Sequence, residues 1–368
     1  MKNIRVAHLG AGDISDRFIV MAKKLKGVEN VAIYSRNIRN ANTKSRKYGI
    51  PDYYDDYRKM LRDVRPDAVV VTTPHSLHAR HAIDCMKAGC HVLVEKPVAT
   101  SFADAKMMYA ASVKYKKIMN GLPFDHYPNY NRALDFVKEK YIGKILSAHS
   151  ELSVQGPPRN NWYYVKKVAH GGALIDVGCY ALSRVISIMG PVKRVTAMTG
   201  MVIPKRILPN GDRIMPDVDD QAIMILDFGN SVFATIRASW AHTHYENYTV
   251  IYGRHGAVYI NADNRPLIIK SDLKKAGKKV DFRGMGNCYE PGGFPKFGPK
   301  DDIMGKFIAA IRSGKQPVYD AAQSLHIMEV MDKAYISSRT GKTQKIMTGF
   351  RMWWPKERKI QDFKSEFI

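Results

Sequence analysis

The chain has 368 residues, and the 45% of them that are hydrophobic suffice for two packed domains or one large one. We find no apolar run near the ~18 residues that span a bilayer, and no apolar stretch typical of a signal peptide at the N-terminus. The cysteines lack Cys-x-x-Cys spacing, so we expect free thiols, no zinc site and a cytoplasmic location. They are Cys85, Cys90, Cys179 and Cys288.

The formal net charge is +24, which raises the question of a nucleic-acid, lipid or acidic partner. The densest cluster of lysines, Lys274–Lys279, is expected at the tip of a hairpin. It has no interleaved aromatic residues, and no nucleic-acid-binding signature accompanies it. We therefore interpret the charge as basic side chains spread over a solvated surface, and we expect neither nucleic acid nor a membrane as partner.

The beginning of the chain predicts a strand, a glycine turn and a helix. Ile4–Leu9 is mostly apolar, and apolar residues recur at helical spacing from Ile14 onward. Gly10 permits a tight turn, and Gly12 lets a pyrophosphate approach the backbone N–H groups that begin the helix. Ser15 stands where this motif usually has a third glycine or alanine, and a plain turn is the alternative. We favour dinucleotide binding, with contacts from Gly10, Gly12, Asp13 and Ile14.

The end of the second predicted strand, Val31–Tyr34, bears on which dinucleotide binds. About 20 residues past the glycines, such domains often carry an acidic residue that binds the adenosine ribose. This chain has Ser35 and Arg36 there, with Arg39 nearby. A guanidinium suits a ribose 2′-phosphate better than a hydroxyl, so Ser35 and Arg36 favour NADP over NAD. The alternative is a solvated loop arginine.

A lysine follows the short apolar run Val92–Val94, which predicts a buried strand. Pro97 cannot donate a ladder hydrogen bond, so the strand ends before it. Lys96 is therefore expected at the carboxyl end of a parallel strand, the edge where ligands bind in open α/β sheets. By position alone, Lys96 is either a solvated charge or a reactive group that faces a ligand.

Strands and helices alternate up to about Pro123, which predicts a doubly wound parallel sheet for residues 1–123. Its further elements are helix Tyr57–Val64, strand Ala68–Thr72, a helix ending at Ala88, a helix from Ser101 to about Tyr115 and strand Lys117–Leu122. Residues 124–368 are predicted to form an α+β domain with a large, mostly antiparallel open sheet. The expected strands are Ile145–Val154, Val192–Val202, Gln221–Phe228, Val232–Trp240, Tyr248–Tyr252 and Ala257–Ile260, and the helices are Asn129–Lys140, Ala173–Met189, Asp301–Arg312 and Ala321–Ser338.

Two groups of polar side chains stand out on predicted helices. His75, His78 and His81 have a spacing that could hold a metal, but no nearby carboxylate or cysteine completes a set, so we expect none. Asp176 and Tyr180 are four residues apart and share one helix face. Taken alone, they could be an ordinary ion pair and a packing residue.

Four motifs occur together in one order: Gly10-Ala11-Gly12, Thr73-Pro74-His75-Ser76-Leu77-His78, Glu95-Lys96-Pro97 and Gly172-Ala173-Leu174-Ile175-Asp176-Val177-Gly178-Cys179-Tyr180. From Met1 to about Lys342, the chain resembles the glucose–fructose oxidoreductase / inositol dehydrogenase / rhizopine-catabolism (Gfo/Idh/MocA) family. The resemblance implies an N-terminal Rossmann domain, a nicotinamide cofactor and a sugar, cyclitol or related carbonyl substrate. It also implies a second domain whose open sheet often forms the oligomer interface, so we expect a homodimer or homotetramer.

The resemblance further implies roles for individual residues. Lys96 matches the catalytic lysine, and Asp176 matches an acid that helps to bind substrate. Tyr180 stands where many members have histidine, so either Tyr180 or Lys96 would exchange the hydroxyl proton, with Lys96 lowering the pKa of Tyr180. Further cofactor contacts are expected from Thr73, Pro74, His75, His78, Glu95 and Lys96. Substrate contacts are expected from Lys96, His126, Trp162, Tyr163, Asp176 and Tyr180, with Trp240 and His244 as weaker candidates.

The activity that we expect is hydride transfer between nicotinamide C4 and a hydroxyl-bearing sugar carbon. Some proteins of similar fold are glycosidases that use transient oxidation by a bound NAD, and a few are dinucleotide-sensing regulators. Retention of Lys96, Asp176 and Tyr180 argues against the regulator, whereas the sequence leaves the glycosidase open.

Overall fold

The computed structural model of this chain describes residues 3–121, 128–158, 161–261, 268–271, 278–280, 288–290, 302–315, 317 and 319–352. Two features singled out from the sequence lie outside these ranges, namely His126 and most of the lysine cluster Lys274–Lys279.

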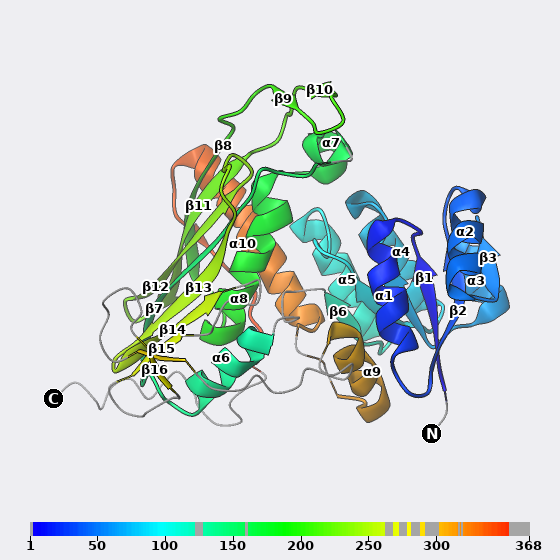
Figure 1. The fold of residues 1–368 in the computed structure, drawn as a ribbon, viewed down its shortest axis with the longest axis horizontal. Helices are drawn as coiled ribbons and strands as arrows, with labels where there is room; N and C mark the ends of the chain where they lie inside the picture. The colour runs from blue at the N-terminus through cyan, green and yellow to red at the C-terminus, as the bar shows by residue number, and fades with distance from the viewer. Residues whose placement is uncertain are drawn as a thin grey trace.

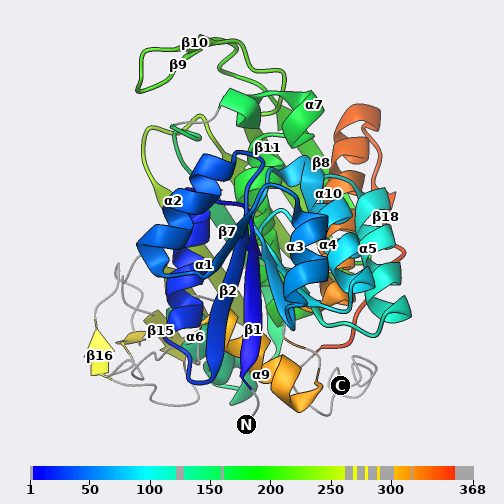
Figure 2. The ribbon, with the colours of Figure 1, turned by 90° about the vertical axis from the view of Figure 1, so that its right-hand side faces the viewer.

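The N-terminal part forms a six-stranded parallel sheet in the order β3-β2-β1-β4-β5-β6. Its strands are β1 (Ile4–Leu9), β2 (Val28–Tyr34), β3 (Asp52–Tyr54), β4 (Ala68–Val71), β5 (His91–Val94) and β6 (Met119–Gly121). Its helices are α1 (Asp13–Lys23), α2 (Ile38–Tyr48), α3 (Tyr57–Val64), α4 (His78–Lys87) and α5 (Phe102–Lys114), with the short 3-10 turn η1 (His75–Leu77) before α4. Figure 2 shows α1 and α2 on one side of the sheet and α3, α4 and α5 on the other. The predicted doubly wound sheet is thus confirmed.

The middle strands of this sheet explain why ligand-facing loops gather at one edge. β1, β4 and β5 lie side by side, and the four residues of β4 are buried, as are Val92–Val94 of β5. Near-continuous apolar runs are typical of parallel strands that are covered on both faces. The carboxyl ends of these strands therefore present the glycine turn, η1 and Lys96 along one edge.

The second part forms a ten-stranded sheet in the order β16-β17-β15-β14-β13-β7-β12-β11-β8-β18, and of its described pairs only β7–β12 is parallel. Its strands are β7 (Ile145–Ser153), β8 (Arg194–Gly200), β11 (Gln221–Gly229), β12 (Val232–Ser239), β13 (Glu246–Gly253), β14 (Gly256–Asn261), β15 (Ile268–Ser271), β16 (Lys278–Val280), β17 (Cys288–Glu290) and β18 (Gln344–Lys345). A separate hairpin is made by β9 (Arg206–Ile207) and β10 (Arg213–Ile214).

The helices among the described residues cover one face of this second sheet, the face that is turned toward the parallel sheet (Figure 1). They are α6 (Pro128–Lys138), α8 (Cys179–Met189) and α10 (Ala321–Thr340), with η2 (Asn161–Tyr164), α7 (Lys166–Ala169) and the π-helical turn η3 (Leu174–Gly178) leading into α8. α9 (Ile303–Ser313) instead packs against α1, so the chain returns to the first sheet late in its course.

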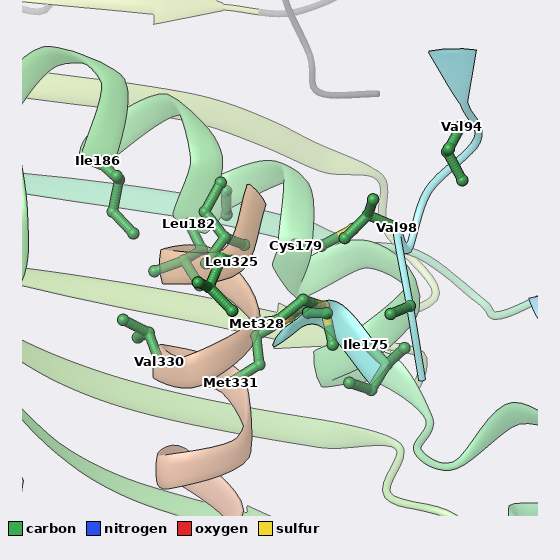
Figure 3. Close-up of a cluster of buried hydrophobic side chains, with 14 of the residues drawn as sticks. Val94, Val98, Ile175, Cys179, Leu182, Ile186, Leu325, Met328, Val330 and Met331 are labelled. Carbon is green, nitrogen blue, oxygen red and sulfur yellow. The ribbon is translucent and has the colours of Figure 1, made fainter. Parts of the chain in front are cut away.

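One hydrophobic core joins the two sheets. Figure 3 shows Val98 beside Cys179, with Ile175 and residues of α10, among them Met328 and Met331, close by, and Val94 belongs to the same cluster. The core therefore fixes the end of β5, the π-helical turn and α10 relative to one another. Because Lys96 and Asp176 lie at the rim of this core, their spacing is set by packing and not by a flexible linker.

Two elements near the site were missed in the sequence. α2 is highly polar, with few apolar residues to mark its period, and β3 is only three residues long. The predicted α-helix Ala173–Met189 is also wrong in one respect, because Leu174–Gly178 forms a π-helical turn before α8 begins at Cys179. No feature of the sequence pattern distinguishes such a turn from an α-helix.

In the described part of the chain, one stretch, Lys166–Met189, is apolar and long enough to cross a membrane by composition alone. This corrects the expectation that no run approaches that length. However, 89% of its apolar window is buried inside the protein, so the composition reflects a core helix.

Candidate active site

The glycine turn between β1 and α1 leaves room for a phosphate. Gly10 has φ of +117°, and a Cβ there would lie 2.7 Å from the carbonyl oxygen of Thr72, so only glycine fits. A Cβ on Gly12 would have no atom within 4 Å, which leaves the start of α1 open to a ligand. Ser15 is fully buried and donates a hydrogen bond to the Gly12 carbonyl at 2.6 Å. The serine therefore tightens this turn in the place of the usual third glycine, and the start of α1 fits a pyrophosphate.

The residues at the end of β2 lie beside this turn. The Gly10 N–H donates to the carbonyl of Tyr34 at 2.9 Å, and Arg36 is exposed just beyond it. Lys44 of α2 also reaches the turn, donating to the Gly12 carbonyl at 3.2 Å and pairing with Asp16. Lys44 was not predicted because α2 itself was not recognised in the sequence.

The loop after β4 forms the middle of the same edge. Pro74 is exposed, whereas Thr73, His75 and His78 are buried. The ring nitrogens of His78 lie 2.6 Å and 2.8 Å from the carbonyl oxygens of Thr73 and Pro97. Burial lowers the pKa of His78, and its contacts with the two carbonyls oppose this shift. The ring lies between the two carbonyl oxygens and so links the loops after β4 and β5. We infer that His78 shapes the edge and offers no free group to a ligand.

Lys96 and Asp176 meet across the two parts of the protein, as the motif pattern predicts. Lys96 Nζ donates to Asp176 Oδ1 at 2.5 Å and to the Asp176 carbonyl oxygen at 3.2 Å. Each side chain is only 12% exposed, so water screens the pair little. Burial is the largest single influence and tends to lower the pKa of Lys96, but Asp176, together with Tyr180 and other neighbours, raises the pKa well above its ordinary value. Lys96 is therefore an ammonium at neutral pH.

The ring of Tyr180 lies under the amine of Lys96. Lys96 Nζ lies 4.8 Å from the ring centroid, within the range of a cation–π contact. Lys96 does act to lower the pKa of Tyr180, as we expected, but the net shift is upward. Burial raises the pKa of the phenol above its ordinary value, and the opposing effect of Lys96 is smaller.

Glu95 completes the buried charges at the end of β5. Its carboxylate accepts the Lys96 N–H at 2.7 Å, and its own N–H donates to Val71 at 2.9 Å. Burial raises the pKa of Glu95, although the nearby Lys96 opposes this. Glu95 therefore braces the backbone of the strand end from inside the protein.

Two aromatic residues of η2 close over the loop after β4. The rings of Trp162 and Tyr163 stack with centroids 4.0 Å apart, and both contact His75 edge-on, at 4.9 Å and 5.3 Å. Burial raises the pKa of Tyr163 to about 12, with Lys96 opposing. These rings form an apolar wall next to Lys96, suited to the C–H face of a sugar.

The two weaker candidates do not join this group. Trp240 is 1% exposed and packs against Tyr164 in the core, whereas the side chain of His244 is 86% exposed and lies near Glu246. The residue types of Trp240 and His244 do not by themselves predict whether they face the core or the solvent. In the described ranges, no three His, Cys, Asp or Glu side chains are grouped to hold a metal ion.

A Rossmann sheet with an open glycine turn and a buried lysine–carboxylate pair at its ligand edge defines a dinucleotide-dependent oxidoreductase. Residues 4–121 match the oxidoreductase family with an NAD-binding Rossmann fold, and residues 130–259 match the GFO/IDH/MocA C-terminal domain. The chain therefore belongs to the Gfo/Idh/MocA oxidoreductase family.

Characterised relatives are similar over most of their length. D-xylose 1-dehydrogenase (NADP(+)) 2 of Haloferax volcanii is 26% identical over 341 residues, which is 90% of this chain and 97% of that protein. Levoglucosan dehydrogenase of Pseudarthrobacter phenanthrenivorans is 27% identical over 266 residues, 67% of each chain. A structure of levoglucosan dehydrogenase with NADH and L-sorbose superposes with a TM-score of 0.82 at 22% identity, covering 94% of this chain and 99% of that one, which shows the shared fold.

Proposed function

We propose that this protein is an NAD(P)-dependent dehydrogenase or reductase that acts on a hydroxyl- or carbonyl-bearing carbon of a sugar, cyclitol or glycoside. The observation that carries the proposal is the buried contact between Lys96 and Asp176 at the carboxyl edge of the Rossmann sheet. Relatives named as levoglucosan, D-xylose and D-glucoside dehydrogenases support a sugar-like substrate.

A nicotinamide dinucleotide, when bound, would supply the group that accepts or gives the hydride. The glycine turn and the first amides of α1 would hold its pyrophosphate. The loops after β4 and β5 would line the nicotinamide end, next to Lys96 and beneath the wall formed by Trp162 and Tyr163.

Each member of the site has a distinct part in this proposal. The Lys96 ammonium would stabilise negative charge on the substrate oxygen and give it a proton during reduction. Asp176 fixes that ammonium and would accept a hydrogen bond from a neighbouring substrate hydroxyl. Tyr180 keeps its proton at neutral pH, so it would support the lysine through its ring and hydrogen-bond the substrate without becoming a base.

The test is to incubate the protein with NAD⁺ or NADP⁺ and a panel of sugars, cyclitols and nitrophenyl glycosides. We expect nicotinamide absorbance to change with at least one sugar or cyclitol. Nitrophenol release without a net change in that absorbance would instead establish the glycosidase, which shares the fold and the three residues. Tight dinucleotide binding with neither reaction would establish the regulator.

We propose further that NADP(H) is preferred over NAD(H), because Arg36 lies exposed where an acid would otherwise bind the ribose. Changing Arg36 to Asp should weaken NADP(H) binding by about 1–3 kcal/mol, the scale of a charge-assisted contact, and leave NAD(H) binding less affected. Calorimetric titration of both cofactors measures this. The matched control is Arg46→Asp, which makes the same charge change in the last turn of α2. Equal affinity of the unmodified protein for both cofactors would rule out the preference.

We also propose that the protein forms a homodimer or homotetramer through the open face of the second sheet. Neighbouring strands place large apolar side chains on this face, with Met198 80% and Ile223 52% exposed and paired in register. Ile225 and Phe233 extend the patch. Contiguous apolar patches of this kind mark interaction surfaces in soluble proteins.

A further inference from the structure

The position of Asp176 depends on the turn that precedes it, and that turn is held by Asp219, a residue of the loop that leads into β11. Three successive N–H groups at its start all donate to Asp219. They are those of Gly172 (to Oδ1, 2.8 Å), Ala173 (to the carbonyl oxygen, 2.9 Å) and Leu174 (to Oδ2, 2.9 Å). The N–H of Asp176 then donates to the Gly172 carbonyl at 2.9 Å. A continuous set of hydrogen bonds thus leads from Asp219 to Asp176.

The sequence provides space for this contact with two glycines. A Cβ on Gly172 would lie 1.8 Å from the Asp219 carbonyl oxygen, and one on Gly171 would lie 2.2 Å from the hydroxyl oxygen of Tyr335. A side chain on Gly172 would force the turn away from Asp219, and one on Gly171 would displace the hydroxyl of Tyr335. The paired glycines therefore serve close approach, which is the signal in the sequence that points to this contact.

Asp219 is itself held from two sides. Tyr335 of α10 donates its hydroxyl to Asp219 Oδ1 at 2.6 Å. The next residue, Asp220, is bonded to the sheet, since its N–H donates to Gly200 at 2.9 Å and its carbonyl accepts from Trp240 at 2.6 Å. The carboxylate of Asp219 is therefore fixed relative to both the second sheet and α10.

We propose that Asp219 is a positioning residue of the active site, which holds the carboxylate of Asp176 against the Lys96 amine, and that Tyr335 holds Asp219. Asp219 acts on Lys96 through the backbone of the π-helical turn. The negative charge of Asp219 also stabilises the aligned N–H groups at the start of that turn. The effect on turnover rests on the proposed function, whereas the effect on Lys96 does not.

The first experiment needs no substrate. Competitive labelling of Lys96 by acetic anhydride, followed by mass spectrometry across a pH series, reports how firmly Asp176 holds the ammonium. In Asp219→Asn, which keeps the shape but turns one acceptor into a donor, we expect Lys96 labelling at about pH 10 to rise about fivefold or more. The control Asp217→Asn makes the same substitution at a nearby carboxylate, which accepts the Lys166 N–H (2.5 Å), and should leave Lys96 unchanged. An equal response in the two variants, or none in Asp219→Asn, overturns the proposal.

The second experiment uses turnover with the substrate found by the panel. Asp219→Asn should lower kcat about 10–100-fold, because small displacements of reacting groups cost that much, while dinucleotide affinity stays within about twofold. Tyr335→Phe should cause a smaller loss, about 3–10-fold, and gives the same test if Asp219→Asn fails to fold.

A double-mutant cycle decides whether Asp219 acts through Asp176. In an Asp176→Asn background, adding Asp219→Asn should cost less than about twofold, because the group that it positions is already gone. If the loss of kcat in the double variant equals the product of the losses in the two single variants, the proposal is contradicted. If no substrate is turned over, the proposed function fails, and the labelling experiment still decides the role of Asp219.

Discussion

The surroundings of Lys96 and Tyr180 change the pKa values of both side chains. Asp176 and other neighbours keep Lys96 protonated, and burial keeps the Tyr180 phenol protonated, so both residues are proton donors at neutral pH. The sequence placed these residues together but could not give the sign of the Tyr180 shift. That sign depends on which part of the ring faces the lysine and on how deeply the ring is buried.

This arrangement makes the two directions of the reaction respond differently to pH. Alcohol oxidation needs Lys96 to lose its proton, so we expect its rate to rise steadily from about pH 7 to 10, while carbonyl reduction changes little. Asp176→Asn should move the rise in oxidation to lower pH, since the carboxylate that raises the pKa of Lys96 is removed. A pH–rate profile of each direction measures this. An oxidation rate already level near pH 7 in the unmodified protein would contradict it.

Among the structural elements, the predictable ones were those with a strong apolar period. β1, α3 and β5 follow apolar runs or a helical repeat, and the cap of α5 at Ser101 was readable as a side chain that accepts the Asp104 N–H. The π-helical turn could not be predicted, because hydrogen bonds between residues five apart produce no distinct pattern of apolar residues in so short a turn. Asp219 was missed for a related reason, since its partners are backbone amides and only the paired glycines indicated a close approach.

Helix α10 also carries a buried histidine that ties the C-terminal segment to the sheet. His326 Nε2 accepts the Val192 N–H at 2.9 Å and Nδ1 faces the Thr348 hydroxyl at 3.0 Å, which requires a neutral ring. Burial lowers the pKa of His326 to about 4, below the ordinary value of 6.5. Because the folded pKa lies below the unfolded one, this stability is fully present above pH 6.5 and is lost as pH falls toward 4.

We expect His326→Gln to flatten the pH dependence of unfolding. Between about pH 6.5 and 4, its free energy of unfolding should fall less steeply than that of the unmodified protein, by up to about 1.4 kcal/mol per pH unit. Urea unfolding at several pH values measures the slopes. His244→Gln, at an exposed position, is the control and should leave the slope unchanged. Equal slopes for His326→Gln and the unmodified protein would refute this account.

At the scale of the whole molecule, the site is divided between two sheets that share one core, and no helix of the described residues covers the far face of the second sheet. The two-part architecture was predictable from the change in strand pattern. The spatial meeting of Lys96 and Asp176 was predictable only through the order of the four motifs, since neither residue alone indicates its partner.

The apolar face of the second sheet, which carries Met198 and Ile223, leads to a prediction about the oligomeric state. Light scattering at micromolar concentration should show a dimer or tetramer, and the double change Met198→Glu with Ile223→Glu should shift it toward monomer, because buried like charges oppose association. Val113→Glu, at a 60% exposed position on α5, should leave the assembly unchanged. A monomer in the unmodified protein would remove the basis for this interface.

The central claim is that Lys96, fixed by Asp176, handles the substrate oxygen and its proton. Turnover of Lys96→Met, measured beside Tyr180→Phe with the substrate found by the panel, tests it most directly. Lys96→Met should lower kcat about 10²–10⁴-fold and leave dinucleotide affinity nearly intact, whereas Tyr180→Phe, which keeps the ring under the amine, should lower kcat about 10-fold or less. Near-normal turnover by Lys96→Met, or a loss in Tyr180→Phe as large as that of the lysine variant, would contradict the account.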